Sequence, residues 1–308
     1  MPLLAYLARR VAQAVMILLG ITVVTYVLLY LIPADPARQI AGRSATAATV
    51  ASIREQLGLD LPLWRQYLRY LGHLLQGDLG RSYIQRTEVA TLIASRLPAT
   101  LLLLAGAIFF ELLIGVTAGV LAATRRGRAS DRVIMVLSFV FVSAPQFVVG
   151  ILLLYVFAVR LGWFPIGGYG TPAHLVLPAL TLGLLGGGWY SRMTRSSMID
   201  VLHQDYVRTA RAKGASEPRV LFRHALRNAV LPIVAMIGLD IGIFMSGAVV
   251  VESVFGWPGI GQLAWQAIQR VDFPIILGVT LVAACAIVLG NLLADLIAPL
   301  IDPRIKLR

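Results

Sequence analysis

VAQAVMILLGITVVTYVLLYLI, residues 11–32, carries no charged side chain, and as a helix it is long enough to cross the hydrocarbon core of a bilayer. The apolar core of a cleaved signal peptide is shorter, at about 7–15 residues. We therefore expect this segment to be retained as the first membrane-spanning helix.

Five further segments of similar character follow along the chain. Lipid offers no partner for backbone N–H and C=O groups, so such segments must be helical. The chain is 58% hydrophobic and only 14% charged, whereas soluble domains carry about 25% charged residues. The sequence predicts an all-α integral membrane protein, a single domain over residues 1–308 with six transmembrane helices at about 11–32, 97–124, 133–159, 175–191, 228–251 and 273–300.

Basic residues set the expected orientation. The formal net charge is +12, which in a soluble protein would suggest nucleic acid as a partner. Here the basic side chains lie between apolar segments, and such residues are retained on the cytoplasmic side. The rule places both termini, the second–third connection and residues 192–227 in the cytoplasm, on the evidence of Arg9, Arg10, Arg125, Arg126, Arg128, Arg132, Arg304, Lys306, Arg308 and eight basic residues within 192–227.

Residues 33–96 form a long connection that the same rule leaves outside the cell. It holds eight arginines, but the rule weakens for loops beyond about 60 residues. We expect a folded external segment with a helix near Thr46–Leu57, ended by Gly58. Trp64, Tyr67 and Tyr70 predict a second helix at the membrane surface.

The cytoplasmic segment before the fifth span predicts a helix, a turn and a second helix. Asp205 is placed to cap a short helix from Tyr206 to Lys213, and Gly214 to end it in the left-handed conformation. Ser216 can cap the helix that follows. Tyr206, Thr209, Ala210 and Lys213 would share one face, where small side chains allow close approach of another surface. A basic loop held near anionic lipid is the alternative explanation of this composition.

The stretch Tyr206-Val-Arg-Thr-Ala-Arg-Ala-Lys-Gly-Ala215 resembles the cytoplasmic signature of permease subunits of bacterial ABC importers, in the dipeptide/oligopeptide/nickel branch. The long first external loop resembles the first of that branch's two permeases. Four other stretches carry the resemblance across nearly the whole chain, namely Pro33-Ala-Asp-Pro36, Tyr67-Leu-Arg-Tyr-Leu71, Gly77-Asp-Leu-Gly-Arg-Ser-Tyr83 and Gly247-Ala-Val-Val-Val-Glu252 with Val254-Phe-Gly-Trp-Pro-Gly-Ile-Gly261.

This resemblance implies a type I ABC importer permease-like bundle and a coupling helix that fits a groove of a separate ATPase. The implied partners are two ABC ATPase subunits, a second homologous permease, an extracytoplasmic substrate-binding protein and the lipid bilayer of the bacterial plasma (inner) membrane, with no nucleic acid. The implied ATPase-coupling residues are Tyr206, Arg208, Thr209, Ala210, Lys213, Gly214 and Ala215.

The coupling segment departs from the general importer pattern. Arg208 stands at the position of a glutamate and Thr209 at that of an alanine. The Leu-Pro pair, Leu231-Pro232, comes five residues late. These departures put in doubt any ion pair from the missing glutamate.

Catalytic and cofactor signatures are absent from the sequence. There is no Gly-x-x-x-x-Gly-Lys-Ser/Thr phosphate loop, so ATP and Mg²⁺ are expected on the partner ATPases and no cofactor on this chain. The single cysteine, Cys285, allows no disulfide within the chain. The four histidines lack metal-ligand spacing, and no nucleophile–base–acid set occurs. We expect a permease subunit and not an enzyme.

Three acidic residues lie inside predicted spans, where ionisable groups are costly and suggest function. They are Glu111, Asp240 and Asp295. We hypothesise that Asp240 faces the translocation path and favours a cationic group on the substrate, with Glu111 as a further candidate. The alternative is that these acids are hydrogen-bond partners between helices. Glu252 is a candidate for the outer gate, or else part of an interfacial turn.

A second function remains open from the residues. An ion-coupled secondary transporter would use intramembrane acids such as Glu111 and Asp240. It leaves the ordered cytoplasmic segment unexplained. The substrate is not readable: relatives of this branch import dipeptides, longer peptides, glutathione, nickel complexes or oligosaccharides.

Overall fold

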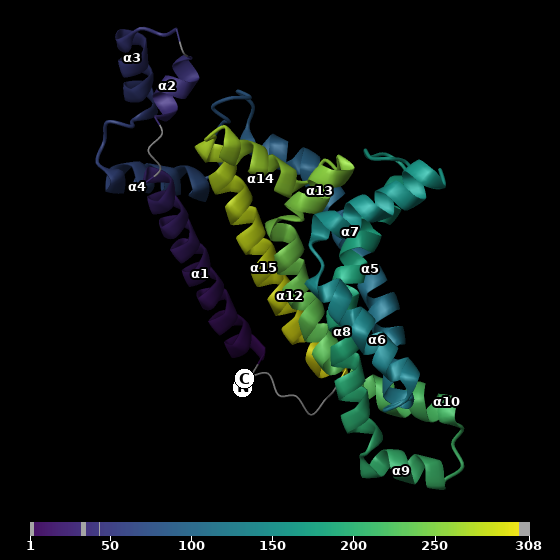
Figure 1. The fold of residues 1–308 in the computed structure, drawn as a ribbon. Coiled ribbons are helices and arrows are strands. Elements are labelled where there is room, and N and C mark those ends of the chain that lie inside the picture. Colours follow the sequence, from purple (N-terminus) through teal and green to yellow (C-terminus); the bar gives the residue numbers. More distant parts are fainter. Residues whose placement is uncertain (1–2, 32–34, 43, 302–308) are drawn as a thin grey trace.

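The computed structural model describes residues 3–31, 35–42 and 44–301, which form an elongated helical bundle (Figure 1). Three helices of residues 36–75 gather at one end, and residues 205–219 project from the other. The elements are α1 Leu3–Leu31, α2 Pro36–Ala41, α3 Ala47–Leu57, α4 Leu63–Leu75, α5 Val89–Thr124, α6 Ala129–Ser143, α7 Gln146–Leu153, the π-helical η1 Leu154–Arg160, α8 Pro172–Leu202, α9 Asp205–Ala212, α10 Glu217–Arg219, the π-helical η2 Val220–Leu226, α11 Arg227–Ala229, α12 Leu231–Gly247, α13 Val249–Phe255, α14 Ile260–Gln269 and α15 Phe273–Ile301.

The described helices account for some of the six predicted spans by their length and composition. Three of them, residues 8–31, 89–124 and 273–293, are long and apolar enough to cross a membrane. Two bent pairs, Ala129–Ser143 with Gln146–Arg160 and Glu217–Ala229 with Leu231–Met245, would each add one span. α8 runs beside α5 but carries charged residues in its second half. The count of six therefore stays a prediction.

The predicted third span, 133–159, is divided between two helical segments. α6 and the segment from α7 through η1 meet at 106°. Pro145 precedes α7, and Ala144 before it takes an extended conformation with ψ of 134°. A proline disfavours helical geometry in the residue before it, which explains the break.

Glycines of the second and fourth predicted spans allow α8 to pack closely on α5, the most extensive helix pairing among the described residues. A Cβ on Gly115 would lie 2.3 Å from the Cβ of Tyr190, and one on Gly183 would lie 2.3 Å from that of Phe110. No side chain larger than hydrogen fits such contacts, and small residues at helix interfaces let membrane helices associate. α8 is longer than predicted, because it continues to Leu202.

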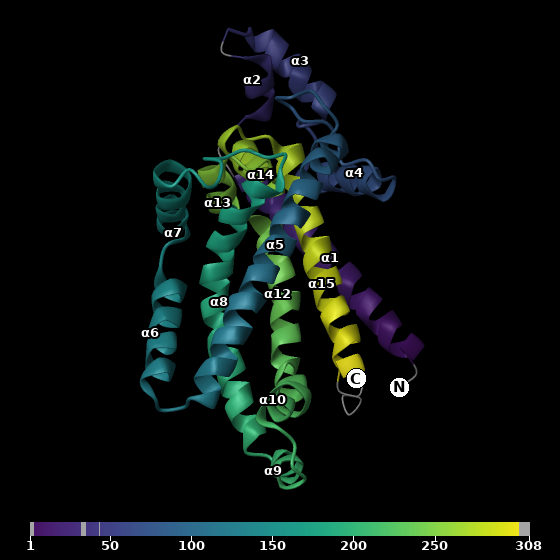
Figure 2. The same ribbon diagram turned by 90° about the vertical axis from the view of Figure 1, so that its right-hand side faces the viewer.

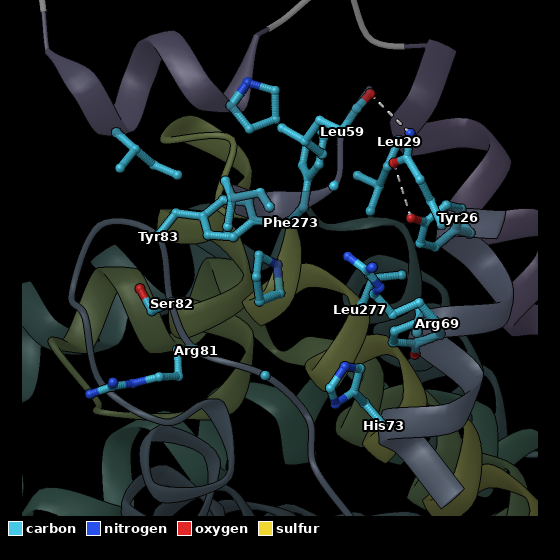
Figure 3. A pocket seen from close by; sticks show the side chains of 18 of the residues that line it. Tyr26, Leu29, Leu59, Arg69, His73, Arg81, Ser82, Tyr83, Phe273 and Leu277 are labelled. Atoms are coloured by element: carbon cyan, nitrogen blue, oxygen red, sulfur yellow. Dashed lines mark hydrogen bonds between the residues drawn. The ribbon is translucent and has the colours of Figure 1, made fainter. Parts of the chain in front are cut away.

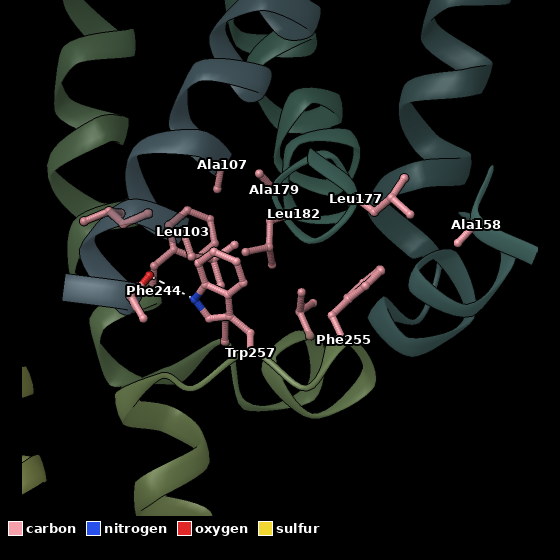
Figure 4. Close-up of a cluster of buried hydrophobic side chains, with 13 residues drawn as sticks. Leu103, Ala107, Ala158, Leu177, Ala179, Leu182, Phe244, Phe255 and Trp257 are labelled. Carbon is pink, nitrogen blue, oxygen red and sulfur yellow. Dashed lines mark hydrogen bonds between the residues drawn. The ribbon is translucent and has the colours of Figure 1, made fainter. Parts of the chain in front are cut away.

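A buried apolar cluster closes the bundle toward its external end (Figure 4). Trp257, only 1% exposed, lies at its centre, and its indole N–H donates to the carbonyl of Ala99 at 2.9 Å. Leu103 and Leu182 approach from α5 and α8. This cluster anchors the loop after α13 on the membrane helices.

The external segment folds largely as predicted. α3 ends at Gly58, whose φ is +68°, and α4 contains Trp64, Tyr67 and Tyr70. The hydroxyls of Tyr67 and Thr22 lie 3.0 Å apart, so α4 is tied to α1. α5 begins at Val89, earlier than the predicted start at 97. Pro33 and Ala34 lie outside the described residues.

Asp272 fastens the external loop to the bundle. Its carboxylate accepts hydrogen bonds from the hydroxyl of Ser82 and from the backbone N–H groups of Tyr83 and Ile84, the latter two at 3.1 and 3.3 Å. Asp272 is 1% exposed. A buried carboxylate needs such partners, so the loop and the start of α15 are held together.

The first and last helices meet at the end opposite α2–α4 (Figure 2). The carboxylate of Asp295 on α15 accepts from the guanidinium of Arg10, and it accepts from the hydroxyl of Tyr6 at 3.3 Å. α9 lies toward that same end of the bundle. The cytoplasmic position of both termini stays a prediction, and Arg304, Lys306 and Arg308 lie outside the described residues.

Candidate functional site

A helical lever projects from the membrane helices beyond the last turns of α8 (Figures 1 and 2). α9 crosses its tip, a turn at Gly214 reverses the chain, and α10, η2 and α11 lead back to α12. The second half of the lever contains the π-helical segment η2, a geometry that is often found at functional sites. The lever thus joins two long helices, α8 and α12.

The structure agrees with the sequence prediction at the C-terminal end of α9 and differs from it at the N-terminal end. Gly214 has φ of +79°, and its N–H donates to the carbonyl of Arg211 at 2.9 Å, so the predicted left-handed end is confirmed. The predicted capping by Asp205 is wrong: Gln204 occupies the cap position, and Asp205 lies in the first turn, 3.5 Å from Arg208. An acidic side chain in the first turn still interacts favourably with the positive N-terminal end of the helix dipole. Asp205 can therefore stabilise α9 from the first turn as well as from the cap position.

The second helix of the lever begins where predicted. Ser216 occupies the cap position of α10, with Glu217 and Pro218 in its first turn, although no capping hydrogen bond comes from the serine side chain. Proline is favoured at this position because its missing N–H has no helical partner there.

Three contacts make the lever rigid. Val207 of α9 and Val220 of η2 are both fully buried, although most of the neighbouring residues are exposed. The guanidinium of Arg211 donates to the carboxylate of Glu217 at 2.8 Å across the turn. The amide of Asn228 donates to the hydroxyl of Tyr206 at 2.7 Å. These contacts hold α9 against the returning helix.

The outward face of α9 is largely open to solvent. Tyr206 is 42% exposed, Arg208, Thr209 and Lys213 are exposed, and Ala210 and Ala215 are half-buried. The structure therefore brings the predicted coupling residues together on a rigid, basic and accessible surface. Such a surface suits docking against another protein.

The base of the lever is packed into the bundle. Ala123 of α5, Met198 of α8, and Ala225 and Ala229 of the returning segment form a buried cluster. Close-packed interiors transmit displacement instead of absorbing it. A displacement of α9 would therefore be transmitted to α5, α8 and α12.

The acids of the predicted spans fall into two groups. Glu111 of α5 and Asp240 of α12 are neighbours close enough to interact electrostatically, and the hydroxyl of Tyr190 on α8 donates to Asp240. Glu111 is 1% exposed, whereas Asp240 is half-buried. Asp295 instead joins α1 to α15. Tyr190 was missed by the sequence reasoning, because no pattern distinguishes it from an ordinary interfacial aromatic.

Glu252 belongs to a different structure at the external end. Its side chain is fully buried, and its carboxylate accepts from the N–H of Gln262 at 2.7 Å, in the first turn of α14. The N–H of Ile260 donates to the hydroxyl of Thr100 at 2.8 Å. Glu252 and Thr100 thus satisfy two of the free N–H groups at the start of α14 and fix it to α13 and α5.

Two family comparisons cover most of the chain. Residues 115–307 match the family described as binding-protein-dependent transport system inner membrane component, and residues 3–104 match the N-terminal part described for such components.

Individual relatives extend these matches. The chain is 42% identical over 304 residues to the glutathione transport system permease protein GsiC of Salmonella paratyphi A, and 44% identical over 317 residues to a putative peptide permease protein of Brucella ovis. Each match covers 99% of both chains. Among solved structures, the fold is similar to that of the MetNI methionine ABC transporter, with a TM-score of 0.54 at 18% identity over 69% of this chain and 97% of that one.

Proposed function

Since the chain belongs to the family of binding-protein-dependent transport system inner membrane components, the permeases of bacterial ABC importers, we propose that it forms half of the channel of a peptide importer. The family makes it a multi-pass protein of the bacterial plasma membrane that works with ATPase and binding-protein partners. A second, similar permease would complete the channel, and hydrolysis of ATP would take place on the two ATPases and not on this chain.

The exposed face of α9 is the observation that carries this proposal. It is basic and largely exposed, and the segment that carries it is connected to α5 and α8 by a buried cluster. We assign the docking of the ATPase to Tyr206, Arg208, Thr209, Ala210, Lys213, Gly214 and Ala215. Since position 208 holds arginine and not the glutamate of the general importer pattern, the basic side chains of this face would provide the polar contacts to the ATPase.

The mechanism is alternating access. The external binding protein delivers its substrate at the face formed by α2–α4 and α13–α14. Closure of the two ATPases around ATP displaces α9, and the packed cluster at the base of the lever carries the movement to the membrane helices. Glu252 would keep α13 and α14 together as one unit of the outer gate while these helices reorient.

Peptides are the substrate class that the relatives favour. The names of two similar permeases refer to glutathione and to peptides, and glutathione is itself a modified tripeptide. An ion-driven secondary transporter, the alternative suggested by Glu111 and Asp240, would need no surface such as α9.

The test is transport by the purified complex in vesicles. Peptide uptake that requires ATP and is abolished by orthovanadate, together with co-purifying ATPase subunits, is the expected result. Uptake that collapses with an ionophore at constant ATP, or a chain that purifies without an ATPase, would refute the proposal.

If Asp240 faces the translocation path, its replacement should affect the transport of cationic substrates. Replacing it with asparagine should reduce uptake of a peptide with a free amino terminus about tenfold, because a charge-assisted hydrogen bond contributes about 1.5–3 kcal/mol. Uptake of the same peptide with an acetylated amino terminus should change little. The matched control is Asp295→Asn, which removes an acid that is paired with Arg10. Equal uptake of all peptides by Asp240→Asn would exclude this role.

A further inference from the structure

A cavity of about 1040 Å³ opens at the external end of the molecule (Figure 3). The end of α1, the C-terminus of α3, one face of α4, the loop 78–86 and the first turn of α15 surround it. Typical small-molecule sites measure about 300–1000 Å³, so a short peptide fits inside. The coupling site and the acids of the spans do not line this cavity.

The cavity wall carries more positive charge than its acids balance. Asp35 is paired with Arg54, and Asp78 lies 3.2 Å from the ring of His73. Three further arginines line the wall, and none has a carboxylate within ion-pair distance among the described residues; they are Arg69, Arg81 and Arg86. The positive charge of these arginines would therefore favour the binding of a negatively charged group in the cavity.

Arg69 is the best placed of the three. A Cβ on Gly58 would lie 2.4 Å from its Nη1 atom, so the guanidinium rests directly on the residue that ends α3. The C-terminal end of a helix attracts a cation. This contact positions the guanidinium without a carboxylate to occupy it, and its planar fork of N–H donors matches a carboxylate in two-point geometry.

Aromatic side chains supply the rest of the wall. Burial raises the pKa of Tyr70 and that of Tyr83 to about 12, so both phenols stay neutral and can donate hydrogen bonds. Phe273 and Leu277 of α15 add apolar surface beside them. A ligand with one anionic end and a mixed polar and apolar body matches this lining.

From this lining we propose that the cavity is an entry site for the substrate, in which Arg69 binds the terminal carboxylate of a peptide between its release from the binding protein and its passage into the channel. The inference rests on the proposed function, because it takes peptides as the substrate class. It adds a site on this chain that selects for a free carboxyl terminus.

Equilibrium binding to the purified complex without binding protein and without nucleotide tests the site. The probes are labelled dialanine, trialanine and glutathione, each compared with its C-terminal amide. The wild-type complex should bind at least one of the free acids and bind its amide about tenfold more weakly. Arg69→Ala should lower affinity for that acid about tenfold and leave affinity for the amide unchanged, because only the charge-assisted contact is lost.

Arg65→Ala is the matched control. Arg65 lies on the same helix, but its guanidinium stacks 5.0 Å from the ring of Trp64 and does not line the cavity. This variant should bind the probes as the wild type does. Arg69→Lys should recover part of the affinity, since it keeps the charge and loses the two-point geometry.

The outcomes separate the two proposals. ATP-dependent uptake of the same probes by the wild type reports the proposed function independently. If uptake occurs but no probe binds, if acid and amide bind equally, or if Arg69→Ala weakens only the docking of the empty binding protein, the entry site is refuted while the importer stands. If the wild type imports no peptide, the proposed function itself fails.

Discussion

Replacing Gly214 with proline should reduce ATP-dependent uptake at least tenfold in reconstituted vesicles, although the protein still inserts and assembles. Gly214 has φ of +79°, and its N–H donates to the carbonyl of Arg211 at 2.9 Å. Proline fixes φ near −65° and has no N–H, a change that costs about 3 kcal/mol or more where a hydrogen bond is lost. A tenfold change in an equilibrium needs only about 1.4 kcal/mol.

The expected defect is in coupling. The altered turn would displace α9 from the orientation that Val207 and the Arg211–Glu217 ion pair now maintain. ATP hydrolysis should continue while uptake falls, so the measured quantity is substrate moved per ATP hydrolysed in the same vesicles.

Two other variants decide what a loss of uptake means. Gly162→Pro places the same substitution at a glycine with φ of +64° and open surroundings, in the connection between η1 and α8, and it should keep most of the coupling. Ala210→Trp adds bulk to the α9 face without altering the turn, and it should uncouple as Gly214→Pro does. Normal uptake in both Gly214→Pro and Ala210→Trp would exclude α9 as the ATPase contact.

Asp131→Ala should lower the apparent melting temperature of the purified complex by roughly 6–12 °C. The guanidinium of Arg195 on α8 donates to both carboxylate oxygens of Asp131 on α6, at 2.6 and 2.8 Å. The Asp131 side chain is only 5% exposed and that of Arg195 is 27% exposed. Breaking a buried pair costs about 3–5 kcal/mol, and the partial exposure of Arg195 places this one at the lower end.

Removal of both partners gives the informative comparison. Arg195→Ala in the Asp131→Ala background should recover part of the lost stability, because no charge is then left without its partner. Asp200→Ala removes an exposed acid from α8 and should leave the melting temperature within about 2 °C of the wild type. If Asp131→Ala changed the melting temperature as little as Asp200→Ala does, this ion pair would not hold α6 to α8.

Local signals in the sequence predicted much of the lever and of the external segment. Gly58 and Gly214 end helices because glycine takes the left-handed conformation without strain, and that preference is local to the residue. The position of Asp205 was missed by one residue, because α9 begins at Asp205 with Gln204 at the cap position. The bend before Pro145 could have been read from the proline, but the apolar composition on both sides concealed it.

The sequence by itself determined that this chain is a helical membrane protein with a basic helical segment before α12, because hydropathy, charge and turn residues act over a few neighbouring positions. Tertiary structure alone decided that Glu111, Tyr190 and Asp240 meet and that Asp131 holds Arg195. It also decided that Arg69 lines a cavity with no carboxylate of the described residues within ion-pair distance of its guanidinium. Each of these contacts joins residues from separate helices. Their distances depend on how the separate helices pack against one another, and no periodicity within a single helix contains that information.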